Sequence, residues 1–196
     1  MNNKYQLKVD KSTFNDYNPK LHCVYKKKVK ELDLTAVKPQ RAGIILYTKM
    51  NEVFYFGLGV DTMTKEYTDF GGGISYKDKF DKNVIAGALR EFNEETLNIF
   101  GDWCYDDVQD SLALYNLSNL IIFKYITVDS YNELTLIKNT FLTAYQDMTE
   151  HGIKPEVCDI EWLTLNELKV QITMRDNLFH RIQFFLQKAG QFFWML

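Results

Sequence analysis

The first clear pattern of hydrophobic and polar positions is a pair of apolar runs near residue 50. Residues 42–48 (AGIILYT) and 53–59 (VFYFGLG) are rich in β-branched and aromatic residues, and the polar segment 49–52 separates them. Such runs on either side of a short polar segment are typical of two strands joined by a turn. We therefore expect a β-hairpin.

Three consecutive glycines follow a further short strand-like stretch at 67–70. Gly71, Gly72 and Gly73 carry no Cβ, so their backbone can adopt angles that other residues resist. We expect the chain to leave the strand sharply at this point.

A helical pattern begins after this glycine turn. Between residues 83 and 96 the apolar residues recur at spacings of three and four, which is one face of a helix. Asn83 is a suitable N-cap, with Asp81 as the alternative. The apolar residues of this face are Val84, Ile85, Ala88, Leu89 and Phe92.

The rest of the chain mixes both kinds of element. We expect strands at 111–114, 120–128 and 159–163, and helices at 135–148 and 176–188. Alternation of this kind predicts an α/β fold around one core. The length of 196 residues suits one domain, which we place at 41–196, with 1–40 as an N-terminal extension packed on it.

Composition excludes several classes of protein. The chain is 46% hydrophobic and 25% charged, close to ordinary globular usage, so disorder is a poor explanation. No apolar run approaches the roughly 18 residues of a membrane helix, and the opening segment is polar. We expect a soluble, intracellular, cytoplasmic protein that has no membrane partner. Its net charge of −3 gives no global attraction to nucleic acid.

The candidate chemistry lies on the second face of the 83–96 helix. Glu91, Glu94 and Glu95 are three or four residues apart, which places their carboxylates side by side. Arg90 offers one compensating charge, so the remaining negative charge suits a hard divalent cation. The same run is also what a solvated helix face looks like. The adjacent glycines, whose backbone groups can reach an ion or a phosphate, favour a site.

These residues resemble the signature of the Nudix hydrolase family, in which a glycine and a loop precede Arg-Glu-hydrophobic-x-Glu-Glu. Residues 90–96 (REFNEET) match its second half, and Gly72 and Gly73 match its opening. The resemblance is specific over about 70–97. It implies a Nudix-like α/β/α sandwich around a mixed β-sheet and cleavage of phosphoanhydride bonds.

The resemblance also implies roles for individual residues. Glu91, Glu94 and Glu95 would bind Mg²⁺ or Mn²⁺ with the Gly72 carbonyl, and Arg90 would orient the carboxylates. Gly72 and Gly73 would lie at the substrate phosphates. Family members often carry a further acid before a late tryptophan; Glu156, six residues before Trp162, fits, and Glu133 and Glu150 are alternatives. Either Glu91 or Glu156 would accept the proton of the attacking water.

Three departures from the signature stand out. Gly73 precedes Arg90 by 17 positions where the family has 14, so the loop is three residues longer. The loop glutamate is missing: its position holds Lys82, and only Asp78 and Asp81 offer a carboxylate nearby. Leu97 replaces the glycine that follows the glutamates.

Three functions are compatible with this pattern. The leading one is a metal-dependent hydrolase of a nucleoside diphosphate linked to another group, a nucleotide-type small molecule. A messenger RNA cap hydrolase of the viral type is the alternative, because the lysines at 26–28 and 30 could follow an RNA backbone, although a solvated extension explains them too. A catalytically silent nucleotide-binding or docking module is the third. The apolar end, 192–196, suggests a possible homodimer.

Overall fold

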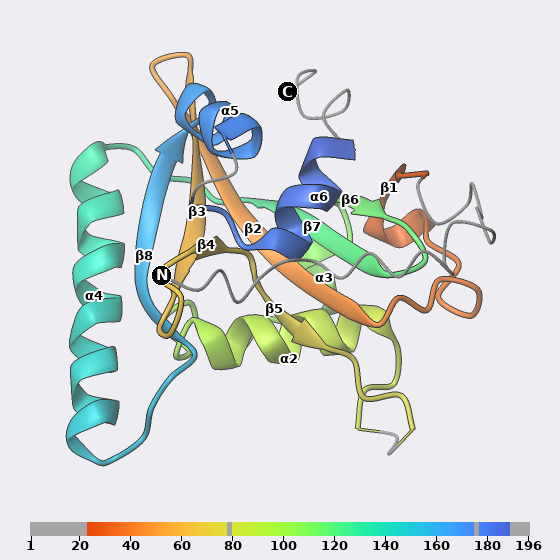
Figure 1. The fold of residues 1–196 in the computed structure, drawn as a ribbon, viewed down its shortest axis with the longest axis horizontal. Helices are drawn as coiled ribbons and strands as arrows, with labels where there is room; N and C mark the ends of the chain where they lie inside the picture. The colour runs from red at the N-terminus through yellow and green to blue at the C-terminus, as the bar shows by residue number, and fades with distance from the viewer. Residues whose placement is uncertain (1–22, 78–79, 175–176, 189–196) are drawn as a thin grey trace, which may run out of the picture.

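A mixed β-sheet forms the centre of the molecule (Figure 1). The computed structural model describes residues 23–77, 80–174 and 177–188. Within them the strand order is β1-β6-β7-β2-β3-β4, with β5 also paired to β2 and β8 to β3. Strands β2 and β7 are parallel and the other pairs antiparallel. The strands are β1 (Tyr25–Lys28), β2 (Arg41–Met50), β3 (Val53–Asp61), β4 (Tyr67–Thr68), β5 (Phe70–Gly73), β6 (Leu112–Tyr115), β7 (Asn119–Tyr125) and β8 (Val157–Thr164).

Helices cover both faces of this sheet. Helix α2 lies below the sheet in the view of Figure 1, α4 runs along β8, and α5 and α6 lie on the other side. A single 3-10 turn follows β1. The helical elements are η2 (Val29–Glu31), α2 (Val84–Glu95), α3 (Tyr105–Val108), α4 (Tyr131–Glu150), α5 (Leu165–Met174) and α6 (His180–Lys188).

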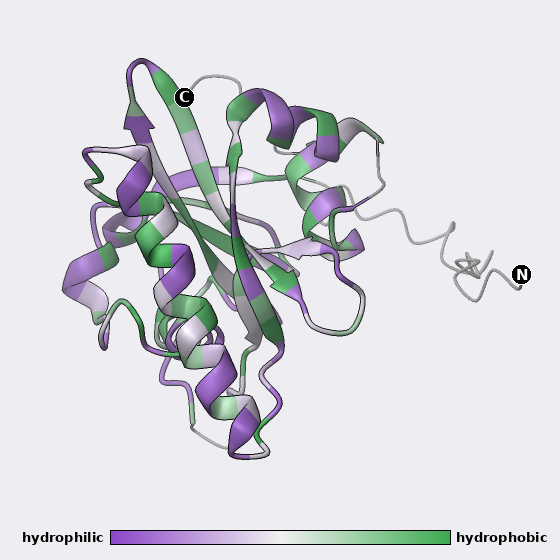
Figure 2. Ribbon diagram, turned by 90° about the vertical axis from the view of Figure 1, so that its left-hand side faces the viewer, coloured by the Kyte–Doolittle hydropathy of each residue, from purple (hydrophilic) through white to green (hydrophobic). Residues whose placement is uncertain are grey.

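Two hydrophobic cores, one on each face, hold the layers together. Alternate residues of β2 face opposite ways, as the pleat of a strand requires. Ile44 and Leu46 pack with the inner face of α2, whereas Ile45 packs with residues of α5 and α6. Figure 2 shows hydrophobic stretches on the strands at the centre of the molecule, between helices that carry both hydrophobic and hydrophilic residues. The expected α/β/α sandwich around a mixed sheet is confirmed.

The expected hairpin is confirmed as β2 and β3. Lys49 pairs with Phe54 and Met50 with Val53, so Asn51 and Glu52 form the turn. Both turn residues have positive φ, 47° and 65°, as a two-residue turn that matches the strand twist requires.

The expectation for the three glycines is wrong in its geometry. All three lie within β5, and none has the positive φ that only glycine tolerates well. Close approach explains them instead. A Cβ on Gly71 would lie 2.3 Å from the Cα of Gly43 on β2, so neither strand could carry a side chain here.

Several helix boundaries differ from expectation. Helix α4 starts at Tyr131, and the helix expected over 176–188 starts at His180. Helix α5 was not expected at all, although Leu168 and Ile172 form a buried pair four residues apart.

The described part of the N-terminal region belongs to the same sheet. Strand β1 pairs with β6, and Val29 and Leu32 are buried in the core. Residues 1–22 and the apolar segment 192–196 lie outside the described residues, so the domain division and the homodimer stay predictions. No helix in the described ranges has the length and apolar character needed to span a bilayer.

Candidate functional site

Helix α2 is anchored at its first turn and along one face. The Asn83 side chain accepts hydrogen bonds from the backbone N–H groups of Ile85 and Ala86, both at 3.0 Å, so the predicted N-cap is confirmed. Phe92 is fully buried and stacks on Trp103. This packing fixes the rotation of the helix and turns Arg90 and Glu91 toward β5.

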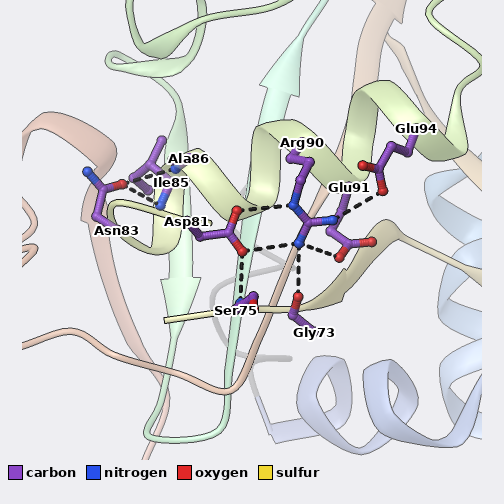
Figure 3. A network of polar contacts seen from close by, with 9 residues as sticks. All are labelled: Gly73, Ser75, Asp81, Asn83, Ile85, Ala86, Arg90, Glu91 and Glu94. Carbon is purple, nitrogen blue, oxygen red and sulfur yellow. Dashed lines mark hydrogen bonds and ion pairs between the residues drawn. The ribbon is translucent and has the colours of Figure 1, made fainter. Parts of the chain in front are cut away.

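Arg90 is the centre of a polar network (Figure 3). Its guanidinium donates to both carboxylate oxygens of Asp81 at 3.1 Å, to Glu94 at 3.1 Å and to the Gly73 carbonyl at 3.1 Å. It also forms an ion pair with Glu91 at 2.7 Å. One arginine thus fixes two glutamates of the helix against the glycine strand.

Asp81, in the loop before the helix, is the buried acid partner of Arg90. Its carboxylate is 4% exposed and also accepts a hydrogen bond from the Ser75 backbone at 2.8 Å. Burial alone would raise the pKa of Asp81, but the hydrogen bonds from Arg90 and Ser75 outweigh it and leave the pKa lowered. The longer loop therefore supplies its own carboxylate. Asp78 lies outside the described residues.

Gly72 makes room for Glu91. A Cβ on Gly72 would lie 2.3 Å from a carboxylate oxygen of Glu91, whereas a Cβ on Gly73 would meet nothing within 4 Å. Burial raises the pKa of Glu91, against the opposing effect of Arg90. The backbone bonds from β5 to the site's charged side chains come from Gly71 and Gly73; the role of the Gly72 carbonyl stays a prediction.

A buried ion pair between Arg41 on β2 and Asp69 also holds β5 in place. Arg41 binds Asp69 through two hydrogen bonds of 2.6 and 2.7 Å and also donates to the Gly71 carbonyl at 2.7 Å. The Gly71 N–H in turn donates to Glu95 at 2.6 Å. The sequence pattern predicted neither Arg41 nor Asp69 as part of the site.

Glu95 and Glu156 line one cavity of about 180 Å³. Gly71, Gly72, Gly73, Arg41 and Phe179 also line it. Glu156 immediately precedes β8, and its charge contributes to the raised pKa of Glu91, so these two carboxylates lie near each other. The alternatives, Glu133 and Glu150, belong to α4 and do not line this cavity.

The three helix glutamates are brought together only in part. Glu91 and Glu94 share Arg90, while Glu95 turns inward to Gly71. Among residues 23–77, 80–174 and 177–188, no three His, Cys, Asp or Glu side chains are close enough to hold an ion as they stand. The expectation of three converging carboxylates is therefore wrong as the side chains stand: two of them share Arg90, and the third points to the backbone of Gly71.

The charges around the site nevertheless suit a hard cation. Two guanidinium groups, of Arg41 and Arg90, face six carboxylates when all are ionised: Asp69, Asp81, Glu91, Glu94, Glu95 and Glu156. Burial raises the pKa of Glu95 well above its ordinary value, with a further contribution from Asp69. Carboxylate and carbonyl oxygens are the donors that Mg²⁺ and Mn²⁺ prefer, so the residues present fit such an ion.

Comparison with known proteins finds similarity in the fold alone. No family model matches the chain, and no curated protein matches its sequence. Similar solved structures include a binary complex of a C. elegans Ap4A hydrolase, at 15% identity and a TM-score of 0.43, covering 82% of this chain and 100% of that one. The NUDIX domain of Shewanella oneidensis NrtR, complexed with ADP ribose, has 12% identity and a TM-score of 0.40, covering 93% and 97%. At these values the similarity bears on no residue of the site, whose function has to follow from its own geometry.

Proposed function

We propose that this protein is a divalent-metal-dependent hydrolase of the Nudix type that cleaves a phosphoanhydride bond in a nucleoside diphosphate linked to another group. The observation that supports it is the excess of carboxylates beside the glycine strand. Both arginines of the site already hold acid partners in Asp69 and Asp81. Glu91 and Glu94 share Arg90 with Asp81, and the buried Glu95 has no ion pair among the described residues; such an excess of acid is costly for partly buried charges unless an ion binds.

Glu91, Glu94 and Glu95, with the Gly72 carbonyl, would hold Mg²⁺ or Mn²⁺. Such an ion neutralises charge that develops on phosphate oxygens and lowers the pKa of a bound water. Asp81 and Arg90 keep Glu91 and Glu94 in place, and the Gly71 N–H keeps Glu95 in place.

Glu91 and Glu156 are the two candidates for the general base. Burial raises the pKa of Glu91, which makes its carboxylate a stronger proton acceptor. Glu156 lines the cavity that Glu95 also lines, and it forms no ion pair with the described residues, so no neighbouring cation competes for its carboxylate.

Incubation of the purified protein with nucleoside diphosphate derivatives and Mg²⁺ or Mn²⁺ tests the proposal. We expect nucleotide products that disappear on chelation of the metal. Glu94→Gln and Glu95→Gln should lower kcat by at least about a hundredfold, because an ion ligand acts on the transition state. Glu150→Gln is the matched control, since Glu150 is an exposed glutamate at the far end of α4.

Two results would contradict the proposed hydrolase activity. One is an absence of products over the whole substrate panel, with nucleotide binding that does not depend on metal; this would indicate a silent nucleotide-binding module. The other is product formation that Glu94→Gln and Glu95→Gln leave unchanged. The activities of Glu156→Gln and Glu133→Gln identify the acid that precedes the late tryptophan. We expect only Glu156→Gln to lose activity, because Glu156 lines the cavity and Glu133 does not.

A further inference from the structure

A second hollow lies away from the carboxylates, between the N-terminal segment and the turn that joins β6 to β7. It encloses about 350 Å³ and is lined mainly by apolar and aromatic side chains, among them Val37 and Leu117. The rings of Tyr25 and Tyr115 lie 5.5 Å apart on its wall, and Tyr25 is 46% exposed. Exposed aromatic rings beside an apolar hollow offer flat surfaces to a planar group.

A third hollow adjoins this one at Lys38 and reaches Asp81 at the edge of the Arg90 network. It encloses about 380 Å³, and Lys38 lines both hollows. Its other lining residues include Tyr76, Lys82 and Asp81, and Asp81 is the residue that holds Arg90. The two hollows meet at Lys38, and the second reaches Asp81; we call this series of lining residues the path. Figure 3 shows the hydrogen bonds between Asp81, at its end, and Arg90.

Exposed lysines lie on this path and on the strand next to it. Lys38 and Lys82 line the path, and all four residues of β1 are exposed, three of them lysines (Lys26, Lys27 and Lys28).

The acids of the N-terminal segment and of α3's end are already engaged. Asp33 accepts hydrogen bonds within its own turn, Glu31 accepts one from the Lys28 backbone, and Asp110 forms an ion pair with Lys30. Asp33 and Glu31 keep their charge in these hydrogen bonds, and Asp81 is paired with Arg90. The five lysines at 26–28, 38 and 82 outnumber the two remaining acids, so the path carries a local positive charge on a protein whose net charge is −3.

We propose that this path binds a single-stranded nucleic acid. Its bases would stack on Tyr25 and Tyr115, and its phosphates would lie along Lys38, Lys82 and the lysines of β1. Aromatic platforms next to a row of cations are how proteins bind single strands without reading a sequence. A duplex keeps its bases stacked inside, so the aromatic hollow favours an unpaired strand.

The connection to the reaction rests on the proposed function. If the carboxylates cleave a diphosphate linkage, the path leads from it along the side of the fold that carries β1 and β6 (Figure 1). The substrate would then be a diphosphate at the end of a polynucleotide rather than a free small molecule. The binding itself requires no hydrolysis, so it can be measured separately.

Fluorescence anisotropy with a labelled oligoribonucleotide of about ten nucleotides, without a 5′ phosphate and without divalent metal, tests the binding. We expect saturable binding to the full chain that weakens as salt rises. Lys38→Glu and Lys82→Glu should each weaken it and reduce the slope of log K against log salt by about 0.7, the value for one phosphate contact of a single strand. Lys49→Glu is the charge-matched control, because Lys49 lies at the opposite end of β2 from Arg41.

The aromatic part of the path has its own pair of variants. Tyr25→Leu keeps an apolar side chain but removes the ring and should weaken binding about tenfold, whereas Tyr25→Phe should retain it. Tyr25 is exposed on an edge strand, so neither change threatens the fold.

Three outcomes would overturn the proposal. They are no binding at low salt, binding that Lys38→Glu and Tyr25→Leu leave unchanged, and equally tight binding of a polyglutamate peptide of matched charge, which would indicate an acidic protein partner. Hydrolysis of small nucleotides by the same preparation would show that the proposed function survives any of them.

Discussion

Glu95 is the residue where stability and function oppose each other. It is 9% exposed, and its burial raises its pKa well above the ordinary 4.5. The folded state therefore holds this proton more tightly than the unfolded state does. Its contribution to stability is present below pH 4.5 and is lost as the pH rises through the raised pKa. At neutral pH and without metal, an ionised Glu95 reduces the stability of the fold.

Glu95→Gln should consequently stabilise the metal-free protein while it removes activity. The amide oxygen can still accept the hydrogen bond from Gly71, and no charge remains to be buried. We expect a gain of about 1 kcal/mol at neutral pH and a flatter dependence of stability on pH above 4.5. Thermal unfolding with and without Mn²⁺ measures both effects, and Mn²⁺ should no longer raise the Tm.

Glu94→Gln provides the comparison for this prediction. The Glu94 side chain is 59% exposed, so its removal should change the stability of the metal-free protein by less than about 0.5 kcal/mol. A metal-free Glu95→Gln protein that is less stable than wild type at neutral pH would contradict the account of Glu95.

Leu97 occupies a backbone position that suits glycine. Its φ is 54°, in the left-handed region, where an L residue costs roughly 1–2 kcal/mol. Its side chain packs partly on the core, so removing it also costs energy. Leu97→Ala loses the packing and keeps the strain, whereas Leu97→Gly loses both.

Leu97→Gly should therefore be more stable than Leu97→Ala by about 1 kcal/mol, the reverse of the order of the two residues inside a helix. Chemical denaturation of the two variants measures the difference. If alanine proves the more stable, the left-handed conformation of residue 97 is wrong.

At the scale of elements, the sequence predicted those whose signal is local. Helix α2 has apolar residues at regular spacing and Asn83 as its cap, and the β2–β3 hairpin has a polar turn between two apolar runs. The sequence pattern did not predict helix α5. Leu168 and Ile172 are its only buried apolar residues among those described, and two residues are too few to show a helical period.

Contacts between distant segments could not be predicted from one sequence. Arg41 and Asp69 are 28 residues apart and meet only because β5 pairs with β2. The same pairing explains why the glycines of β5 were mistaken for a turn, because their need for close approach arises from Gly43 and Glu91. The candidate glutamates and Arg90 were identifiable because they share one helix, whereas Asp81 and Gly71, which hold Arg90 and Glu95, come from other segments.

The glycine strand offers a test of the fit between β5 and α2. Gly72→Ala would place a methyl group 2.3 Å from the present position of the Glu91 carboxylate, so Glu91 must move. We expect kcat to fall by about a hundredfold, the typical cost of a displacement of about 1 Å at a reacting centre. Gly73→Ala is the control one residue away, since nothing lies within 4 Å of its Cβ and its φ is not positive. Equal activity of the two variants would show that Glu91 needs no space at Gly72.

At the scale of the whole molecule, the expected extension and the expected domain share one core. Strand β1 continues the sheet beyond β6, and the short η2 turn after it carries Val29 into the core that also contains α2. Lysines on this edge strand are also a common means of preventing a sheet edge from pairing with another molecule. A chain that starts at residue 41 would therefore lose one strand of the sheet and part of the hydrophobic core.

We predict that such a shortened chain is severely destabilised. Val29 and Leu32 are 1% and 8% exposed, and each buried side chain of this type contributes about 1.5–3 kcal/mol. Their loss, with the ladder between β1 and β6, removes a large share of the 5–15 kcal/mol that typically separates folded from unfolded domains. Val29→Ala in the full chain measures the packing term alone and should cost about 1–3 kcal/mol by denaturant unfolding. If the chain from residue 41 unfolds at the same denaturant concentration as the full protein, the N-terminal segment is an independent extension after all.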